Sequence, residues 1–204
     1  MKKFGNAVIL CGGKSSRMGY DKSLAKINGE YLIDSLANKL LGIFDDVKLS
    51  AIDDEKFKQF DIVVVKDVFT DFWGPEHVGP ALAIYSALLQ ATSEYIFVVA
   101  CDMPLIDVNH IKKMQELIDN PVHGVIPLNG KFIEPLYGYY SRKSLPYFEE
   151  ALKNHDFKIK NILKNCDICY ASENFSRTFD EDLQMFTNLN YLEDAKNLGE
   201  ITFE

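Results

Sequence analysis

The chain is short of positive charge and of long apolar runs. Its 22 Lys and Arg residues are outnumbered by 30 Asp and Glu residues, which gives a formal net charge of -8 over 204 residues. This balance excludes a protein that holds nucleic acid through a broad basic surface, although a few local cations can still bind a small anionic ligand. No apolar run approaches the roughly 20 residues of a membrane span, and no small-residue cleavage site follows the first apolar stretch. We therefore expect a cytoplasmic protein that binds neither nucleic acid nor membranes.

Cysteine is also scarce, because four residues in a chain of this length do not make a disulfide scaffold. Cys166 and Cys169 have the C-x-x-C spacing of many metal and redox sites. They fall in an expected strand, however, and strand residues three apart point to opposite faces. We therefore predict buried structural thiols here rather than a shared metal or a disulfide. Cys11, at the end of the first expected strand, is predicted to be a small packing residue and not a nucleophile.

The most informative segment follows the first apolar run, which ends at Leu10 and Cys11. It carries glycines, hydroxyls and cations in the order Gly12, Gly13, Ser15, Ser16, Arg17, Gly19 and Lys22. Glycines let a backbone approach a ligand closely, and successive N–H groups can converge on an anion. Arginine also matches the paired oxygens of a phosphate. The segment is therefore predicted to bind a nucleoside triphosphate, the alternative being an ordinary strand-to-helix loop with surface charges.

Two familiar nucleotide loops are excluded by the spacing of these glycines. A Walker A loop needs two glycines five positions apart before Lys and Ser or Thr, and the dinucleotide fingerprint needs G-x-G-x-x-G. Glycines at 12, 13 and 19 satisfy neither pattern. P-loop hydrolysis and hydride transfer therefore lose support.

Apolar runs alternate with helical patterns along the chain, without internal repeats or linkers. Strands are expected at 6–10, 46–50, 62–65, 95–100, 124–127, 134–140 and 167–171. Apolar stripes with helical spacing lie between them, at Leu32, Ile33, Leu36, Leu40 and Leu41, at Leu82, Tyr85, Leu88 and Leu89, and at Phe148, Ala151 and Leu152. Several strands are continuous β-branched runs, as burial on both faces requires. The pattern predicts one α/β domain over 1–204, a three-layer Rossmann-like fold with a mostly parallel sheet and its ligand at the carboxyl ends of the strands.

A second strong signal is Asp102, which follows the buried run at 95–100 and precedes Pro104. A carboxylate at the carboxyl end of a strand can hold Mg²⁺, which takes one or two carboxylates together with phosphate oxygens. The alternative is that Asp102 caps the segment that follows, since aspartate is common at helix starts. Because a triphosphate segment is expected on a neighbouring strand, we favour the metal role.

Weaker signals lie elsewhere in the chain. Asp67 also follows an expected strand and could contact the sugar or a second ion, or simply be solvated. His77 lies in a loop rich in glycine and proline before a helix expected at 81–90, whose N-terminus could face an anion. Asn188 and Asn190 share one side of an extended segment; Asn190 could cap the next helix, or both amides could hold a second substrate or order the metal site. The other histidines, at 110, 123 and 155, form no metal-binding or Ser-His-Asp pattern.

Taken together, these residues resemble the molybdenum cofactor guanylyltransferases, a bacterial family of nucleotidyltransferases. The matching positions follow the family's order: Leu10 to Gly13, Arg17 to Gly19, Asp21, Lys22, Asp67, Gly79, Pro80, Cys101 to Pro104, Glu134 to Leu136 and Asn188 to Asn190. Two departures concern the nucleotide. Cys11 stands where alanine is usual, and Ser50 stands where some members carry asparagine near the guanine.

The resemblance implies a nucleotidyltransferase that transfers GMP from GTP to molybdopterin with the help of Mg²⁺. By its pattern, the nucleotide would be bound by Leu10, Cys11, Gly12, Gly13, Lys22, Ser50, Asp67 and Asp102. Asp102 would hold the metal, Lys22, Arg17 and Asp102 would be catalytic, and Asn188 and Asn190 would lie near the pterin, as would the region of Glu134 and Pro135. Transient contact with other cofactor-biosynthesis proteins or molybdoenzymes is also implied. The alternatives are an enzyme that uses CTP or another phosphorylated small molecule, and a non-catalytic protein that binds GTP or molybdopterin.

Overall fold

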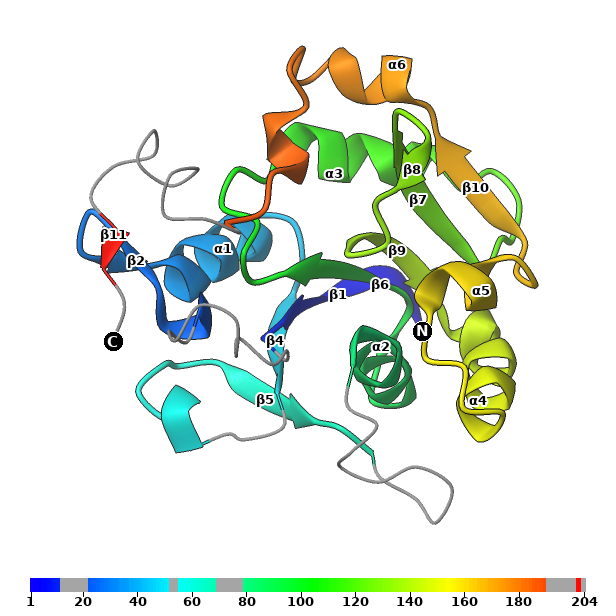
Figure 1. Ribbon diagram of the computed structural model, residues 1–204, viewed down its shortest axis with the longest axis horizontal. Helices are drawn as coiled ribbons and strands as arrows, with labels where there is room; N and C mark the ends of the chain where they lie inside the picture. The colour runs from blue at the N-terminus through cyan, green and yellow to red at the C-terminus, as the bar shows by residue number, and fades with distance from the viewer. Residues whose placement is uncertain (12–21, 52–54, 69–78, 190–200, 203–204) are drawn as a thin grey trace.

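The computed structural model describes residues 1–11, 22–51, 55–68, 79–189 and 201–202, and for Lys22 and Ile201 it describes the backbone alone. Its centre is an eight-stranded sheet (Figure 1), in the order β10-β7-β9-β6-β1-β4-β5 with β8 paired to β7. These strands are β1 (Lys2–Leu10), β4 (Asp46–Ala51), β5 (Val63–Lys66), β6 (Ser93–Ala100), β7 (Gly124–Asn129), β8 (Phe132–Ile133), β9 (Tyr137–Ser141) and β10 (Ile168–Ala171). A small second sheet joins β2 (Lys26–Ile27), β3 (Glu30–Tyr31) and β11 (Ile201–Thr202).

The longer strands of the main sheet run parallel except for β9. β6, β1, β4 and β5 pair in parallel, as do β7 and β10, whereas β9 is antiparallel to both β6 and β7. The mostly parallel sheet predicted from the sequence is therefore confirmed. The strand expected at 134–140 begins only at Tyr137, because the preceding residues form a turn in which the Tyr137 amide donates to the Glu134 carbonyl at 3.1 Å.

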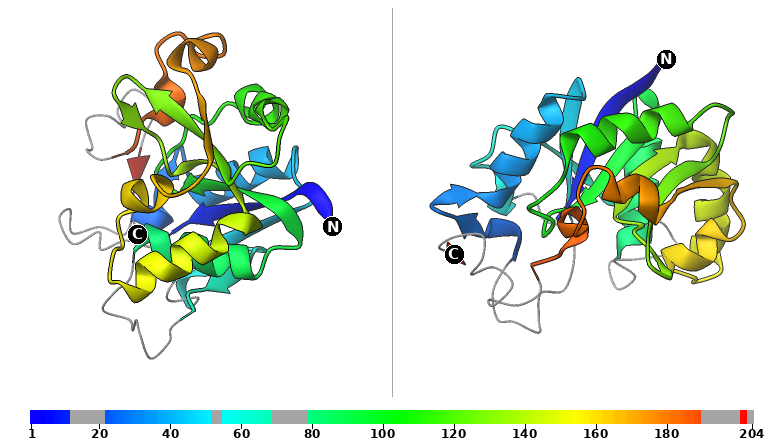
Figure 2. Two further views of the ribbon diagram at one scale, coloured as in Figure 1. Left: turned by 90° about the vertical axis from the view of Figure 1, so that its right-hand side faces the viewer. Right: turned by 90° about the horizontal axis from the view of Figure 1, so that it is seen from above.

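Helices cover both faces of the sheet, as Figure 2 shows, so the three-layer α/β fold is confirmed. α1 (Leu32–Leu41) and α3 (Val108–Met114) pack on one face, and α2 (Pro80–Leu89), α4 (Leu145–Lys153) and α5 (Ile159–Leu163) pack on the other. The alternation of β1 explains the two cores, since Ala7 and Ile9 enter the first while Val8 and Leu10 enter the second. None of the helices in the described ranges is long and apolar enough to cross a membrane.

The predicted helical stripes are largely buried, with two clear exceptions. Leu41 of α1 is 54% exposed and Leu89 of α2 is 41% exposed. Each is the last residue of its helix, where no further helical turn covers the side chain. The spacing of apolar residues therefore identified the helices correctly, but it wrongly predicted that their last apolar residues are buried.

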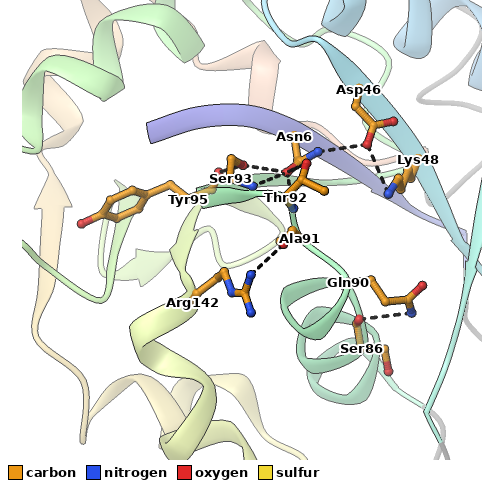
Figure 3. A network of polar contacts seen from close by, with 10 residues as sticks. All are labelled: Asn6, Asp46, Lys48, Ser86, Gln90, Ala91, Thr92, Ser93, Tyr95 and Arg142. Atoms are coloured by element: carbon orange, nitrogen blue, oxygen red, sulfur yellow. Dashed lines mark hydrogen bonds and ion pairs between the residues drawn. The ribbon is translucent and has the colours of Figure 1, made fainter. Parts of the chain in front are cut away.

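One buried asparagine holds the amino edge of the sheet together (Figure 3). Asn6 is 3% exposed, and its Oδ1 accepts hydrogen bonds from the backbone amides of Thr92 and Ser93 at 3.0 and 2.8 Å and from both of their hydroxyls. Its Nδ2 donates to Asp46 Oδ2 at 3.0 Å, and that carboxylate also pairs with Lys48. The network ties the middle of β1 to the starts of β4 and β6 and so helps to set the register that aligns the carboxyl ends of these strands.

Candidate functional site

The parallel strands of one half of the sheet end in a single row. Leu10 of β1 is in register with Ala100 of β6 on one side and with Ser50 of β4 on the other. Ser50 is in turn in register with Val65 of β5. The residues that follow these strands therefore lie along one edge of the sheet, which we call the carboxyl edge.

β1 stands at the switch point of the sheet, because β4 lies on one side of it and β6 on the other. In open α/β sheets, ligands bind at such a point, outside the carboxyl ends of the strands. The backbone is closely bonded here: the Cys11 amide donates to the Ser50 carbonyl at 2.8 Å, and the Cys101 amide donates to the Leu10 carbonyl at 3.0 Å. The end of β1, at Leu10 and Cys11, is therefore fixed beside the residue that precedes Asp102.

Asp102 lies in a tight turn directly after β6. The Met103 amide donates to the Ala100 carbonyl at 3.2 Å, and the Asp102 side chain is half-buried within this turn. Asp102 does not cap α3, because the cap of that helix is Asp107, whose Oδ1 accepts from the His110 amide at 2.7 Å. Asp102 is therefore placed at the carboxyl edge without a role in starting that helix.

The residues at this edge fit a Mg²⁺ ion that is bound largely through its substrate. Across the described ranges, no three His, Cys, Asp or Glu side chains cluster closely enough to form a metal cage of their own. Mg²⁺ usually takes one or two carboxylates and completes its shell with phosphate oxygens and water. Asp102 offers such a carboxylate, whereas a structural zinc site would require four protein ligands.

Ser50 and Asp67 bury polar atoms at the β4–β5 end of the edge. Ser50 is 1% exposed, and within the part of the chain that the structure describes, neither its Oγ nor Asp67 Oδ1 has a hydrogen-bond partner. Desolvation raises the pKa of Asp67 to about 6, and the Ser50 hydroxyl beside it lowers that pKa only in part. Buried polar atoms without partners are uncommon and unfavourable. This pair is therefore suited to form hydrogen bonds with a ligand.

Asp67 and Asp102 are too far apart to hold the same ion. β1 and β4 lie between the strands that carry them. Neighbouring strands are about 4.8 Å apart, so the two carboxyl groups are separated by roughly 14 Å along the edge. Any second ion at Asp67 would therefore be distinct from an ion at Asp102.

Asn188 reaches the same edge from a distant part of the chain. The amide of the next residue, Leu189, donates to the Asp102 carbonyl at 2.8 Å. Asn188 Oδ1 is buried and has no hydrogen-bond partner among the described residues. The structure therefore brings this predicted residue beside Asp102, and it leaves a buried amide oxygen there to be satisfied.

Residues 134–136 also reach the carboxyl edge, because β9 runs antiparallel to β6. The Ala100 amide donates to the Leu136 carbonyl at 3.0 Å, which fixes this segment against the turn that carries Asp102. The Glu134 carboxylate accepts a hydrogen bond from Asn129 Nδ2 at 2.9 Å, and burial raises its pKa. The region that the resemblance places near the pterin is therefore adjacent to Asp102.

Several predicted residues lie outside the described part of the chain, namely Gly12, Gly13, Arg17, His77 and Asn190. For Lys22 the backbone alone is described, in the short 3-10 turn Lys22–Leu24. The helix expected at 81–90 is present at Pro80–Leu89, with a first hydrogen bond of 3.1 Å from the Ala83 amide to the Gly79 carbonyl.

The cysteines pack as predicted, but two of them are less buried. Cys11 is 7% exposed and packs in the core beneath α1, which confirms its packing role. Cys166 packs on the core under α4 and α5, whereas Cys169 packs on the opposite core, so the C-x-x-C spacing does not bring the two thiols to one face. Both are half-buried instead of buried: Cys169 belongs to the edge strand β10, whereas Cys166 lies before that strand, in a turn where its amide donates to the Leu163 carbonyl at 3.2 Å.

The sequence is similar to that of proteins of known family over nearly its whole length. A family model for the MobA-like NTP transferase domain matches residues 7–170. A protein of Peptoclostridium acidaminophilum named probable molybdenum cofactor guanylyltransferase is 32% identical over 209 residues, covering 100% of this chain and 92% of that protein. The molybdenum cofactor guanylyltransferase of Syntrophotalea carbinolica is 35% identical over 193 residues, covering 94% and 89% respectively.

A solved structure shares the fold. The crystal structure of molybdopterin-guanine dinucleotide biosynthesis protein A from Archaeoglobus fulgidus matches with a TM-score of 0.78, over 95% of this chain and 96% of that one, at 24% sequence identity. This likeness concerns the architecture alone. Together with the sequence relatives, it confirms the resemblance that the motifs predicted.

Proposed function

The chain belongs to the MobA-like NTP transferase family, and from this membership we propose that it transfers GMP from GTP to molybdopterin. The reaction releases pyrophosphate and yields the molybdopterin guanine dinucleotide cofactor. Relatives that cover nearly the whole chain carry the name guanylyltransferase. The observation at the site that supports the proposal is the 3.0 Å bond between the Cys101 amide and the Leu10 carbonyl, which holds the end of β1 beside the turn that carries Asp102.

The nucleotide would lie across the carboxyl edge. Its phosphates would meet the backbone where β1 leads into Gly12 and Gly13, and its base and ribose would lie toward Ser50 and Asp67. The buried oxygens of Ser50 and Asp67, which lack a hydrogen-bond partner among the described residues, support this direction, because a nucleoside offers hydrogen-bond donors and acceptors that could satisfy them. Two strands, β1 and β4, lie between the strands that carry Asp67 and Asp102. This spacing supports the direction as well, because a nucleotide with its phosphates at Asp102 could reach Asp67 with its other end.

Asp102 would hold Mg²⁺ against the phosphates. When bound, the ion would neutralise phosphate charge and orient the reacting groups. The position of Asp102 suits this role, because its turn is bonded on both sides: the Met103 amide donates to Ala100, and the Leu189 amide donates to the Asp102 carbonyl itself. A backbone held in this way loses little conformational freedom when the residue that it carries binds a ligand.

Transfer would proceed by attack of a molybdopterin phosphate oxygen on the α-phosphorus of GTP. The bond from that phosphorus to the bridging oxygen of the β-phosphate breaks, and pyrophosphate leaves with the bonding electrons. The attacking phosphate is already ionised at neutral pH, so the step needs no general base and no covalent enzyme intermediate. Chemistry of this kind depends on positioning and charge stabilisation. Lys22 would stabilise charge at the α-phosphate, and Arg17 would neutralise the departing pyrophosphate.

Pyrophosphate release by the purified protein tests the proposal. The assay contains Mg²⁺, molybdopterin and one of ATP, CTP, GTP or UTP, and the product is identified by mass. GTP should support turnover and give the GMP adduct. Turnover with CTP in preference to GTP would replace guanylyl transfer by cytidylyl transfer. Binding of GTP without turnover would make the protein a carrier or binder instead of an enzyme.

The proposal also places the enzyme in the cytoplasm, where its product would pass to molybdoenzymes or to other cofactor-biosynthesis proteins. Chemical cross-linking of the purified protein to a cofactor-free molybdoenzyme, with and without GTP and molybdopterin, tests this contact. A cross-link that forms only with both substrates present is expected, and equal yields in all conditions would contradict a product-dependent encounter.

A further inference from the structure

After β10 the chain forms what we call the C-terminal arm, residues 172–189. It contains α6 (Glu173–Arg177) and the 3-10 turn Gln184–Phe186. In Figure 1 this orange segment passes beside α3 and ends at the loop that follows β6. The arm ends with the 2.8 Å hydrogen bond from the Leu189 amide to the Asp102 carbonyl. Whatever fixes the arm therefore also fixes Asn188 beside Asp102.

A histidine that the proposed reaction does not use lies beneath this arm. His110 of α3 is 0% exposed, and its Nε2 lies 3.0 Å from Ser176 Oγ of α6. Aromatic rings surround it, with centroids 5.4 to 5.9 Å from the imidazole: Tyr137, Phe175, Phe179 and Phe186. Three of these four rings belong to the arm, so His110 is the residue around which the arm packs.

The same histidine is bonded to the region that carries Asp102. Its backbone amide donates to Asp107 Oδ1 at 2.7 Å, and the Asp107 carbonyl accepts from the Tyr137 hydroxyl at 3.2 Å. α3 follows Asp102 after only a short connection, so its first turn is held close to the carboxyl edge. A contact between the arm and His110 therefore also fixes the position of the arm relative to Asp102.

A phenylalanine side chain would fill the space of the His110 imidazole without burying an unsatisfied ring nitrogen. His110 Nδ1 has no hydrogen-bond partner within the described ranges, and Ser176 Oγ is the group that Nε2 meets. The Nε2–H tautomer costs least, because it donates to Ser176 and leaves only an acceptor unsatisfied. Burial lowers the pKa of His110 to about 4, so the ring is neutral near pH 7. The buried hydrogen bond from His110 to Ser176 depends on the orientation of both side chains, whereas apolar packing does not.

We propose that His110 is a positioning residue: its hydrogen bond to Ser176 sets the seat of the C-terminal arm, and thereby the position of Asn188 beside Asp102. This inference rests on the proposed function, in which Asn188 meets the pterin substrate. The rings around His110 pack the arm against α3, and the Gly130 amide also donates to Glu173 Oε2 at 2.7 Å, but that bond is exposed. The bond between His110 and Ser176 is buried, so it sets how the arm lies on α3.

The test is the double variant His110→Phe with Ser176→Ala, which removes both partners of the bond and keeps the apolar shape. Such paired replacement is nearly neutral or stabilising, so the thermal midpoint should not fall. Hydrogen exchange at the Leu189 amide, followed by NMR, should accelerate about five- to ten-fold, which is the change expected for the loss of one hydrogen bond. The KM for molybdopterin should rise by a similar factor while the KM for GTP stays unchanged.

Two further variants separate direction from packing. His110→Gln places an amide nitrogen where Nε2 lies, so it should keep Leu189 exchange and the molybdopterin KM near the wild-type values. His123→Phe is the matched control, because His123 also makes one hydrogen bond and one ring contact, to the Asp167 amide and to Tyr147, but precedes β7 at the opposite edge. It should leave Leu189 exchange unchanged.

The proposal is overturned if Leu189 exchange and the molybdopterin KM of the double variant match those of the wild type. It is also overturned if His110→Gln is as impaired as the double variant, or if His123→Phe accelerates Leu189 exchange to the same extent. Should the wild type show no turnover with GTP and molybdopterin, the proposed function fails, while the Leu189 exchange rates still decide whether His110 seats the arm.

Discussion

The amide nitrogen of Cys101 lies 3.0 Å from the carbonyl oxygen of Leu10. The strand that leads into the glycine-rich segment is therefore bonded, main chain to main chain, to the turn that carries Asp102. Buried backbone groups of this kind are paired regardless of the side chains around them. Side-chain substitutions along the carboxyl edge should accordingly change chemistry more than they change shape.

Asp102→Asn should abolish Mg²⁺-dependent pyrophosphate release while leaving the fold intact. The amide has the size of the carboxylate but carries no charge, so it binds a hard cation poorly. Losing one electrostatic contact of this kind lowers kcat on the order of 100-fold or more. Steady-state pyrophosphate release measures the loss, and circular dichroism with a thermal melt checks the fold.

Asp107→Asn is the matched control for that experiment. Asp107 caps α3 through its side chain, and asparagine caps helices about as well as aspartate does. Its turnover should stay close to the wild-type value. Full activity in Asp102→Asn would refute the metal role, and an equal loss in both variants would indicate damage to the local structure.

Asp67 should make the protein less stable as the pH rises toward about 6. Its folded-state pKa is raised from 3.8 to about 6 by desolvation, so the folded protein holds more protons than the unfolded chain between those values. The free energy of unfolding therefore falls as the pH rises through that window. A shift of this size corresponds in full to about 3 kcal/mol, which solvent screening of a half-buried group reduces to about 1 kcal/mol.

Urea denaturation of the wild type and of Asp67→Asn between pH 4 and pH 7 measures that effect. The variant should gain stability relative to the wild type as the pH rises, because it has no carboxylate to desolvate. A constant difference between the two proteins across the range would mean that Asp67 ionises normally in the folded state.

His110 should act in the opposite direction. Burial lowers its folded-state pKa from 6.5 to about 4, and the neighbouring Asp107 charge opposes this only in part. Between those values the unfolded chain binds more protons, so the free energy of unfolding falls as the pH drops from about 6.5 to about 4. The loss amounts to at most about 3 kcal/mol. In the double variant His110→Phe with Ser176→Ala this component should be missing from the pH profile of the denaturation midpoint, and an unchanged profile would contradict it.

Asn6→Ala should lower the free energy of unfolding by about 2–4 kcal/mol, because it leaves the buried Ser93 amide and the part-buried Thr92 amide without their acceptor. Activity per folded molecule should not change, since the partners of Asn6 lie at the starts of β4 and β6, at the edge opposite Asp102. Asn154→Ala is the control, because that exposed side chain makes one hydrogen bond, to the Glu150 carbonyl, and such surface changes stay within about 0.5 kcal/mol. Chemical denaturation measures both, and a variant Asn6→Ala as stable as this control would contradict the network's role.

Much of the fold could be predicted from the sequence, because buried strands and amphipathic helices are local patterns. The apolar run at 95–100, for example, is found as β6 (Ser93–Ala100). The reversal of β9 could not be predicted, since the direction of pairing depends on neighbours that the strand itself does not encode. The two-residue strands of the small sheet are too short to give a period. That the chain forms one domain stays a prediction.

The candidate site divides in the same way. Asp67 and Asp102 could be assigned to one edge because parallel strands bring their carboxyl ends together. That Asn188 meets Asp102 depends on the path of the C-terminal arm, which is set by contacts between residues far apart in the sequence. His110 had no recognisable pattern, because the rings that bury it come mainly from the arm and so are distant from it in the chain.

Strand β1 contributes Asn6 to the buried network at its middle and ends beside the turn that carries Asp102. Thermal stability and chemistry therefore depend on different residues of the same strand. Substitutions among the partners of Asn6 can consequently be used to raise or lower the melting temperature while the carboxyl edge stays as it is.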